Sequence, residues 1–141
     1  MIIKVIAAKL LAKKVNKDTL KWSSKPVETQ QKVFDDLIKM ASQTKFGKDH
    51  HFKKIKSFKD FANQVPVRDY EALKPYVDLV VQGKEAILWP GKPVYFAKTS
   101  GTTSGAKYIP LTKESIPFHI SAARNALLSY VYETGKADFL K

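Results

Sequence analysis

The sequence has 141 residues, a hydrophobic content of 44% and a formal net charge of +12, and it contains no cysteine. This composition is that of a globular chain with one core, or of one part of a larger domain, and excludes a disordered tail. The lack of cysteine excludes a disulfide framework and a thiolate metal site. It leaves the compartment open, although a reducing cytoplasm fits, and cytoplasmic is the location we expect.

Residues 1–90 are predicted to be mainly helical, beginning with a helix over residues 2–14 that extends toward Trp22. Lysines interrupt its apolar residues, so the segment is neither a signal peptide nor a membrane span. We favour an amphipathic packing helix over one that lies on a membrane surface. The apolar stripe is expected to contain Ile3, Ile6, Leu10 and Val15.

A second helix is predicted to begin after Ser24, the expected N-cap, with Pro26 in its first turn, and to run to about Ser42. The stretch "TKFGKDHHF" (44–52) reads as a break in which Gly47 occupies a left-handed or turn position. These two segments therefore predict a helix followed by an irregular connection.

Two further helices are predicted before the composition changes. Ser57 is expected to cap a short helix that stops before Pro66. The next helix has Pro75 near its start and ends at Gly83. Its inner face is expected to contain Tyr76, Val80 and Val81.

The period changes from helical to extended in "PVYFAKTSGTTSGAKYIPLT", residues 93–112, where two strand-like runs flank a segment of Thr, Ser and Gly. Pro110 places the second strand at a sheet edge or a bulge. Because two strands alone form a marginal sheet, we expect the sheet to continue in another part of the polypeptide. Open strand edges also lead us to expect self-association of this chain.

A last helix is predicted over residues 113–134, with Thr112 as its cap and Pro117 in its first turn. The fold class that follows is α-rich α/β: several N-terminal helices, a β-hairpin and a following helix. The apolar residues at helical spacing are Ile116, Ile120, Ala123, Leu127 and Val131.

The connection inside the hairpin offers many small donors. Gly101 and Gly105 allow backbone N–H groups to approach an anion, and Lys107 adds a positive charge. We predict polyphosphate binding over the alternative of an ordinary polar turn. Neither the Walker spacing nor the Rossmann glycine pattern is present, so this is a phosphate loop within a hairpin. The five hydroxyls belong to Thr99, Ser100, Thr102, Thr103 and Ser104.

The stretch "TSGTTSGAK" (99–107) resembles the signature phosphate loop of the acyl-adenylating superfamily. Its flanks, "YFAKTSGTTSG" and "KYIPLT", resemble the auxin-responsive acyl-acid amido synthetase family (the Gretchen Hagen type) in a bacterial-like version. The resemblance extends from about Lys25 to Tyr130. Three other segments share it: "TKFGKDH" (44–50), "FANQVPVRDYEALKPYV" (61–77) and "LWPGK" (88–92).

The resemblance implies an ATP-dependent ligase that uses Mg²⁺. A small carboxylic acid is adenylated, and an amino acid or another amine then displaces AMP to give an amide. Residues 1–141 would be the N-terminal portion of the adenylation domain, with residues 93–112 as its phosphate-loop hairpin. We therefore expect an incomplete acyl-adenylating fold, the remainder of the same polypeptide as a partner, and no adenylating activity from this segment alone.

The resemblance also implies roles for individual residues. The loop from Thr99 to Gly105 would contact ATP phosphates, and Lys107 would be the catalytic charge, although many family members have one more residue between the second glycine and the lysine. Helix packing is the alternative, and the favoured one, for three candidates of the acyl-substrate wall. These are Phe118, Ser121 and Ala122.

The net charge of +12 raises a different hypothesis, a small basic module that binds nucleic acid or docks onto the rest of its own polypeptide. Only two of the 25 basic residues are arginine, and the lysines are spread along the chain, so we expect no nucleic-acid partner. His50, His51 and His119 lack metal-ligand spacing and are expected to be solvated or locally hydrogen-bonded, without a metal site.

Overall fold

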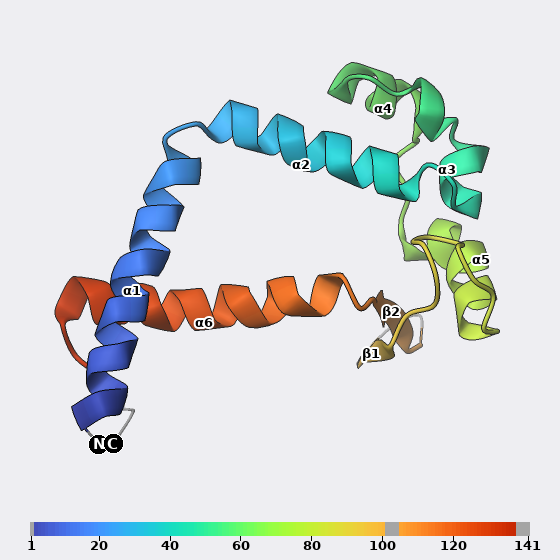
Figure 1. Ribbon diagram of the computed structural model, residues 1–141. Helices are drawn as coiled ribbons and strands as arrows, with labels where there is room; N and C mark the ends of the chain where they lie inside the picture. The colour runs from blue at the N-terminus through green and yellow to red at the C-terminus, as the bar shows by residue number, and fades with distance from the viewer. Residues whose placement is uncertain (1, 101–104, 138–141) are drawn as a thin grey trace. The chain divides into compact units, whose positions relative to one another are not determined.

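The computed structural model describes residues 2–100 and 105–137, which form an α-rich fold with one small antiparallel sheet. The chain divides into two compact units, residues 1–30 with 116–141, and residues 31–115. No helix in the described ranges is both long and apolar enough to cross a membrane. The elements are α1 (Ile2–Ser23), α2 (Pro26–Ala41), α3 (Lys45–Asp49), the 3₁₀ helix η1 (Phe52–Lys54), α4 (Phe58–Gln64), α5 (Tyr70–Val81), β1 (Tyr95–Thr99), β2 (Lys107–Leu111) and α6 (Ser115–Thr134) (Figure 1).

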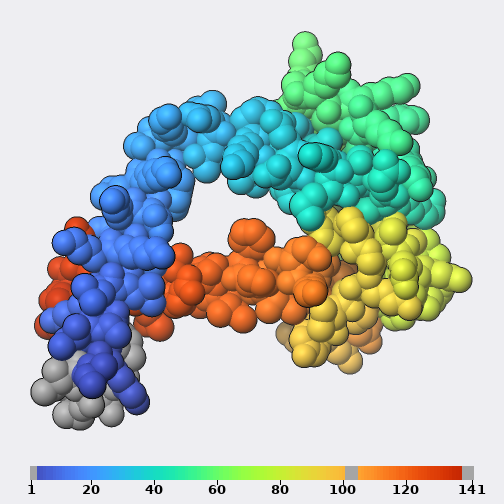
Figure 2. Space-filling view, in the orientation of Figure 1, coloured from blue at the N-terminus to red at the C-terminus, as the bar shows by residue number. Residues whose placement is uncertain are grey.

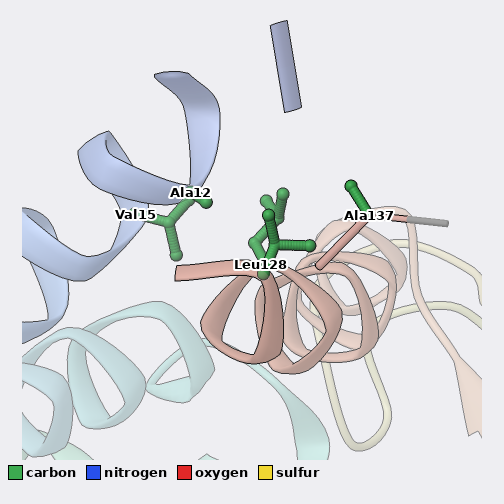
Figure 3. Close-up of a cluster of buried hydrophobic side chains, with 5 residues drawn as sticks. Ala12, Val15, Leu128 and Ala137 are labelled. Atoms are coloured by element: carbon green, nitrogen blue, oxygen red, sulfur yellow. The ribbon is translucent and has the colours of Figure 1, made fainter. Parts of the chain in front are cut away.

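The first unit has a small core between α1 and α6. Figure 3 shows Ala12 and Val15 of α1 beside Leu128 of α6. The predicted stripe on α1 is wrong for its N-terminal part, because Ile3 is 81% and Leu10 66% exposed. The contact with α6 involves a different set of α1 positions, so most of the stripe stays outside the core. On α6, Leu128 and Val131 are buried, whereas the expected Ile120 and Leu127 are exposed.

The second unit has its own core, built mainly from aromatic rings around the C-terminal half of α2. Phe46 and Phe52 meet edge to face with ring centroids 5.8 Å apart, and Phe34 and Phe61 do the same at 6.0 Å. Such edge-to-face contacts add to the free energy gained from apolar burial. The buried members are Ile38, Ala41, Phe52 and Ile55.

The prediction that Ser24 caps α2 is wrong. Its hydroxyl donates to the carbonyl of Lys21 at 2.9 Å, so it satisfies the C-terminal end of α1 instead. The N–H of Thr29 donates to the carbonyl of Lys25, which places the first turn of α2 at Lys25. The predicted cap of α4 is confirmed, because Ser57 accepts the N–H of Asp60 at 3.1 Å.

The segment predicted to be a break is the short helix α3, and Gly47 lies inside it. A Cβ at position 47 would overlap the carbonyl oxygen of Ala41, so glycine is required for close approach and not for a left-handed backbone. The left-handed residue is His51, with a φ of 53°. Thr44, which is fully buried, caps α3 by accepting the N–H of Gly47 at 3.0 Å.

The remaining free N–H groups at the start of α3 are satisfied by the segment after α5. Lys45 donates to the carbonyl of Ala86 at 2.7 Å, and Phe46 donates to that of Ile87 at 2.9 Å. The space-filling view shows this segment against α3 (Figure 2). Because residues 88–94 lead directly into β1, these bonds fix the approach to the hairpin.

The helix α5 begins at Tyr70, so Pro75 lies farther from the start of the helix than predicted. Asp69 caps it by accepting the N–H of Ala72 at 2.8 Å, so Pro75 lies inside the helix and not near its start. The predicted stop is confirmed, since Gly83 has a φ of 83°. Val77 and Val80 are buried, whereas Val81, expected on the inner face, is 47% exposed. Consecutive residues of a helix point in different directions, so Val81 does not share the face of Val80.

Candidate functional site

The predicted hairpin is confirmed, and its register places two candidate residues opposite each other. β1 and β2 pair antiparallel from Tyr95 with Leu111 to Thr99 with Lys107. Directly paired residues point to the same face of a sheet, so the side chains of Thr99 and Lys107 share one face at the mouth of the loop. Residues 100–106 connect them.

The outer edge of β2 is closed by α5. The backbone N–H of Tyr108 donates to the hydroxyl oxygen of Tyr70 at 2.9 Å. Because alternate residues of a strand direct their N–H groups to the same side, position 110 faces this edge too. Pro110 has no N–H to leave unpaired there, which confirms its predicted edge position in the sheet that the described residues form.

The described part of the loop offers accessible hydroxyls, an open glycine and a nearby lysine. Thr99 and Ser100 are exposed, so their hydroxyls are accessible. Gly105 has a φ of 79°, and within the described ranges no heavy atom lies within 4 Å of where its Cβ would be. The ammonium of Lys107, a half-buried side chain, lies 5.4 Å from the centroid of the Tyr70 ring. The candidates Gly101, Thr102, Thr103 and Ser104 lie outside the described residues.

These residues combine neutral donors with one cation, and the described loop and stem residues present no carboxylate to repel an anion. Hydrogen bonds from charged donors to phosphate are about twice as strong as neutral ones. The arrangement therefore fits a phosphate group better than a cation or an apolar ligand.

The three candidates for the substrate wall lie on α6, in the first unit, whereas the hairpin belongs to the second. Phe118 is 75% exposed, and Ala122 is also exposed. The hydroxyl of Ser121 donates to the carbonyl of Phe118 at 3.0 Å. Phe118 and Ala122 therefore pack against neither core of the described residues.

The histidines were predicted to be solvated or locally hydrogen-bonded, and the buried His50 is locally bonded. Its Nδ1 lies 2.8 Å from the carbonyl oxygen of Phe46, and its ring stacks on that of Phe46. Among the described residues, no three His, Asp or Glu side chains gather as metal ligands would.

Tyr70 is the residue near the site that sequence reasoning did not identify. Asp69 at the N-cap places it as the first residue of α5, and only the tertiary contact with β2 distinguishes it from the other tyrosines.

Besides its contact with β2, α5 makes a polar contact with α3. Asp49 accepts hydrogen bonds from the Lys45 ammonium at 2.7 Å and from the Tyr76 hydroxyl at 2.9 Å. These donors hold the pKa of Asp49 below its usual value, and Asp49 in turn raises the pKa of Lys45. Burial, followed by the bond to Asp49, raises the pKa of Tyr76.

We predict a pH-dependent loss of stability for Asp49→Asn. The lowered pKa of Asp49 means that its contribution to folding is present above the unfolded-state value of about 3.9 and is lost as the pH falls through the folded-state pKa. The raised pKa values of Lys45 and Tyr76 give contributions that are present below about pH 10 and lost as the pH rises further. The variant should therefore be less stable than wild type in urea at pH 7, with a smaller difference at pH 3.

Asp78→Asn is the matched control. Asp78 pairs with Lys74 within α5 at 2.7 Å, an exposed pair of the kind that contributes little. If both variants show the same pH dependence of stability, the contact between α3 and α5 contributes no more to stability than the exposed pair within α5.

Comparison with known proteins places the chain in a family. Its sequence matches the GH3 family N-terminal domain over residues 16–138. Indole-3-acetic acid-amido synthetase GH3.15 of Arabidopsis thaliana is 29% identical over 96 residues, which cover 67% of this chain and 16% of that protein. Indole-3-acetic acid-amido synthetase GH3.2 of Arabidopsis thaliana is 29% identical over 93 residues, covering 64% and 17%.

A third relative matches a shorter segment more closely. Probable indole-3-acetic acid-amido synthetase GH3.13 of Oryza sativa subsp. japonica is 38% identical over 58 residues, which cover 40% of this chain and 12% of that protein. The chain thus spans 12–17% of the length of these relatives. The family match includes the hairpin and both units. The chain belongs to the GH3 family, and its residues 16–138 match that family's N-terminal domain.

Proposed function

We propose that this chain is the phosphate-binding part of an ATP-dependent acyl-acid amido synthetase. The observation that carries the proposal is the hairpin, which brings Thr99 and Lys107 to one face beside a loop of Ser, Thr and Gly. The relatives are named as amido synthetases of indole-3-acetic acid, which supports a carboxylic acid as the first substrate and an amine as the second.

The reaction has two steps. A carboxylate oxygen of the acid attacks the α-phosphorus of ATP, and the bond from that phosphorus to the oxygen bridging to the β-phosphate breaks. Pyrophosphate leaves with the electron pair, and an acyl-adenylate remains. The amine nitrogen then attacks the acyl carbon, AMP leaves, and the nitrogen loses a proton to give the amide.

The residues of the hairpin act on the leaving group. Hydroxyls of Thr99 and Ser100 and backbone amides near Gly105 donate to the β- and γ-phosphates. The ammonium of Lys107 balances the negative charge that builds on pyrophosphate as the bond breaks. Donors that are fixed before the reaction stabilise this charge without reorganising, which is how such sites lower the barrier.

Mg²⁺ would bind through the phosphates of ATP and would neutralise part of their negative charge. The high positive charge of the chain favours the approach of such an anionic substrate. For the selection of the acid and the amine, we propose a contribution only from three residues of α6. These residues, Phe118, Ser121 and Ala122, present an apolar surface with small side chains.

ATP–pyrophosphate exchange tests the proposal. The polypeptide encoded by the whole reading frame should exchange labelled pyrophosphate into ATP only when a carboxylic acid substrate is present. A panel of aromatic and aliphatic acids would identify that substrate. The segment 1–141 alone should give no exchange. Binding of duplex DNA or RNA that weakens steeply with salt, together with absent exchange, would instead favour a nucleic-acid module.

A further inference from the structure

Tyr70 makes two contacts with the strand that leaves the loop. Its hydroxyl oxygen accepts the backbone N–H of Tyr108 at 2.9 Å, and its ring lies 5.4 Å from the ammonium of Lys107. The second distance is within the range of a cation–π contact. One side chain of α5 thus contacts both the backbone and the cation at the start of β2.

The position of Tyr70 is itself fixed by local structure. It is the first residue of α5, immediately after Asp69, whose carboxylate caps the helix through the N–H of Ala72. The cap fixes where α5 begins, and with it the backbone position from which Tyr70 extends. The contact therefore joins a fixed helix end to a strand edge whose N–H would otherwise face solvent.

We infer that Tyr70 is a positioning residue for phosphate binding in this chain, an inference that rests on the proposed function. Its hydroxyl holds Tyr108, and with it the pairing of Lys107 with Thr99. Its ring, 5.4 Å from the Lys107 ammonium, restricts the positions that this ammonium can take. Tyr70 acts through Lys107 and the strand, so its removal should weaken ATP binding more than it slows the chemical step.

The test compares Tyr70→Phe, which removes only the hydroxyl, with Tyr70→Leu, which also removes the ring. In the 141-residue chain, hydrogen exchange of the Tyr108 amide is followed by NMR. In the polypeptide encoded by the whole reading frame, ATP–pyrophosphate exchange gives KM for ATP and kcat. Tyr70→Phe should accelerate Tyr108 amide exchange and raise KM about 2- to 10-fold, the range expected for one lost hydrogen bond. Tyr70→Leu should raise KM further, with kcat changed by less than about 2-fold for both.

Tyr76→Phe is the matched control, because it removes a hydroxyl from the same helix. That hydroxyl donates to Asp49 and lies on the α3 side of α5. Tyr76→Phe should leave both the exchange rate of the Tyr108 amide and the KM for ATP unchanged. An equal rise in KM for the two variants would mean that loss of stability is the cause, and would overturn the inference.

Two other results for Tyr70→Phe would also overturn the inference. One is an unchanged exchange rate of the Tyr108 amide, and the other is a faster exchange rate with an unchanged KM for ATP. If Ser100→Ala lowers exchange while Tyr70→Leu does not alter it, the proposed function stands and the positioning role fails. A wild-type polypeptide that neither exchanges pyrophosphate nor binds ATP would overturn both together.

Discussion

Replacing Ser100 or Thr103 by alanine should lower ATP–pyrophosphate exchange by about 10- to 100-fold each. A hydrogen bond to a charged group contributes about 1.5–3 kcal/mol. We propose one such bond to a phosphate oxygen for the Ser100 hydroxyl, and the family resemblance implies another for Thr103. The reduction should appear mainly in kcat if the bond strengthens as pyrophosphate leaves, and in KM if it is equally strong in bound ATP. The measurement is steady-state exchange at saturating acid with ATP varied.

Ser129→Ala provides the control for this prediction. Ser129 is an exposed serine whose hydroxyl donates to the carbonyl of Asn125 within α6, at 2.9 Å. Its removal should leave exchange at the wild-type level. Unaltered exchange in both Ser100→Ala and Thr103→Ala would remove these hydroxyls from the site, whatever the control does.

The substitution Gly47→Ala should destabilise the second unit by at least about 2 kcal/mol, a large part of the stability of a small domain. The added Cβ would overlap the carbonyl oxygen of Ala41, and this neighbour is backbone that cannot rotate away. Moving α3 to make room would break its bonds to Ala86 and Ile87, at 2.7 and 2.9 Å. Urea denaturation followed by tryptophan fluorescence measures the change, since Trp89 packs on the core of this unit.

Lys48→Ala distinguishes this mechanism from a general effect of helix substitution. Lys48 is the next residue of α3 and is exposed, so its replacement should change the free energy of unfolding by less than about 0.5 kcal/mol. A Gly47→Ala variant as stable as Lys48→Ala would show that the α3 backbone does not need its close approach to α2.

The hairpin could be predicted from the sequence because its signal is local. Alternation of side chains marks the first strand, and Pro110 marks an edge or a bulge in the second. The register that pairs Thr99 with Lys107 was not part of the prediction and comes from the structure. The cap at Ser57 was predictable for the same reason, since a serine and the N–H three residues later are enough to define it.

Several failures depend on contacts that the pattern of neighbouring residues does not show. Gly47 looks like a turn glycine until the carbonyl of Ala41 is seen beside it. The stripe on α1 is apolar, yet which of its residues are buried depends on where α6 contacts it. Tyr70 could not be selected because its partner, Tyr108, lies 38 residues later in the chain. Whether a segment forms a helix or a strand could be predicted from neighbouring residues, whereas the element that it contacts could not.

Hydrogen–deuterium exchange of peptides covering residues 95–111 tests the central claim most directly, in the polypeptide encoded by the whole reading frame. If the hairpin holds the β- and γ-phosphates, saturating Mg²⁺ with ATP or with pyrophosphate should slow exchange in these peptides, and AMP should not. An unchanged rate with ATP at saturation, or equal protection by AMP, would contradict the assignment of this hairpin to phosphate binding.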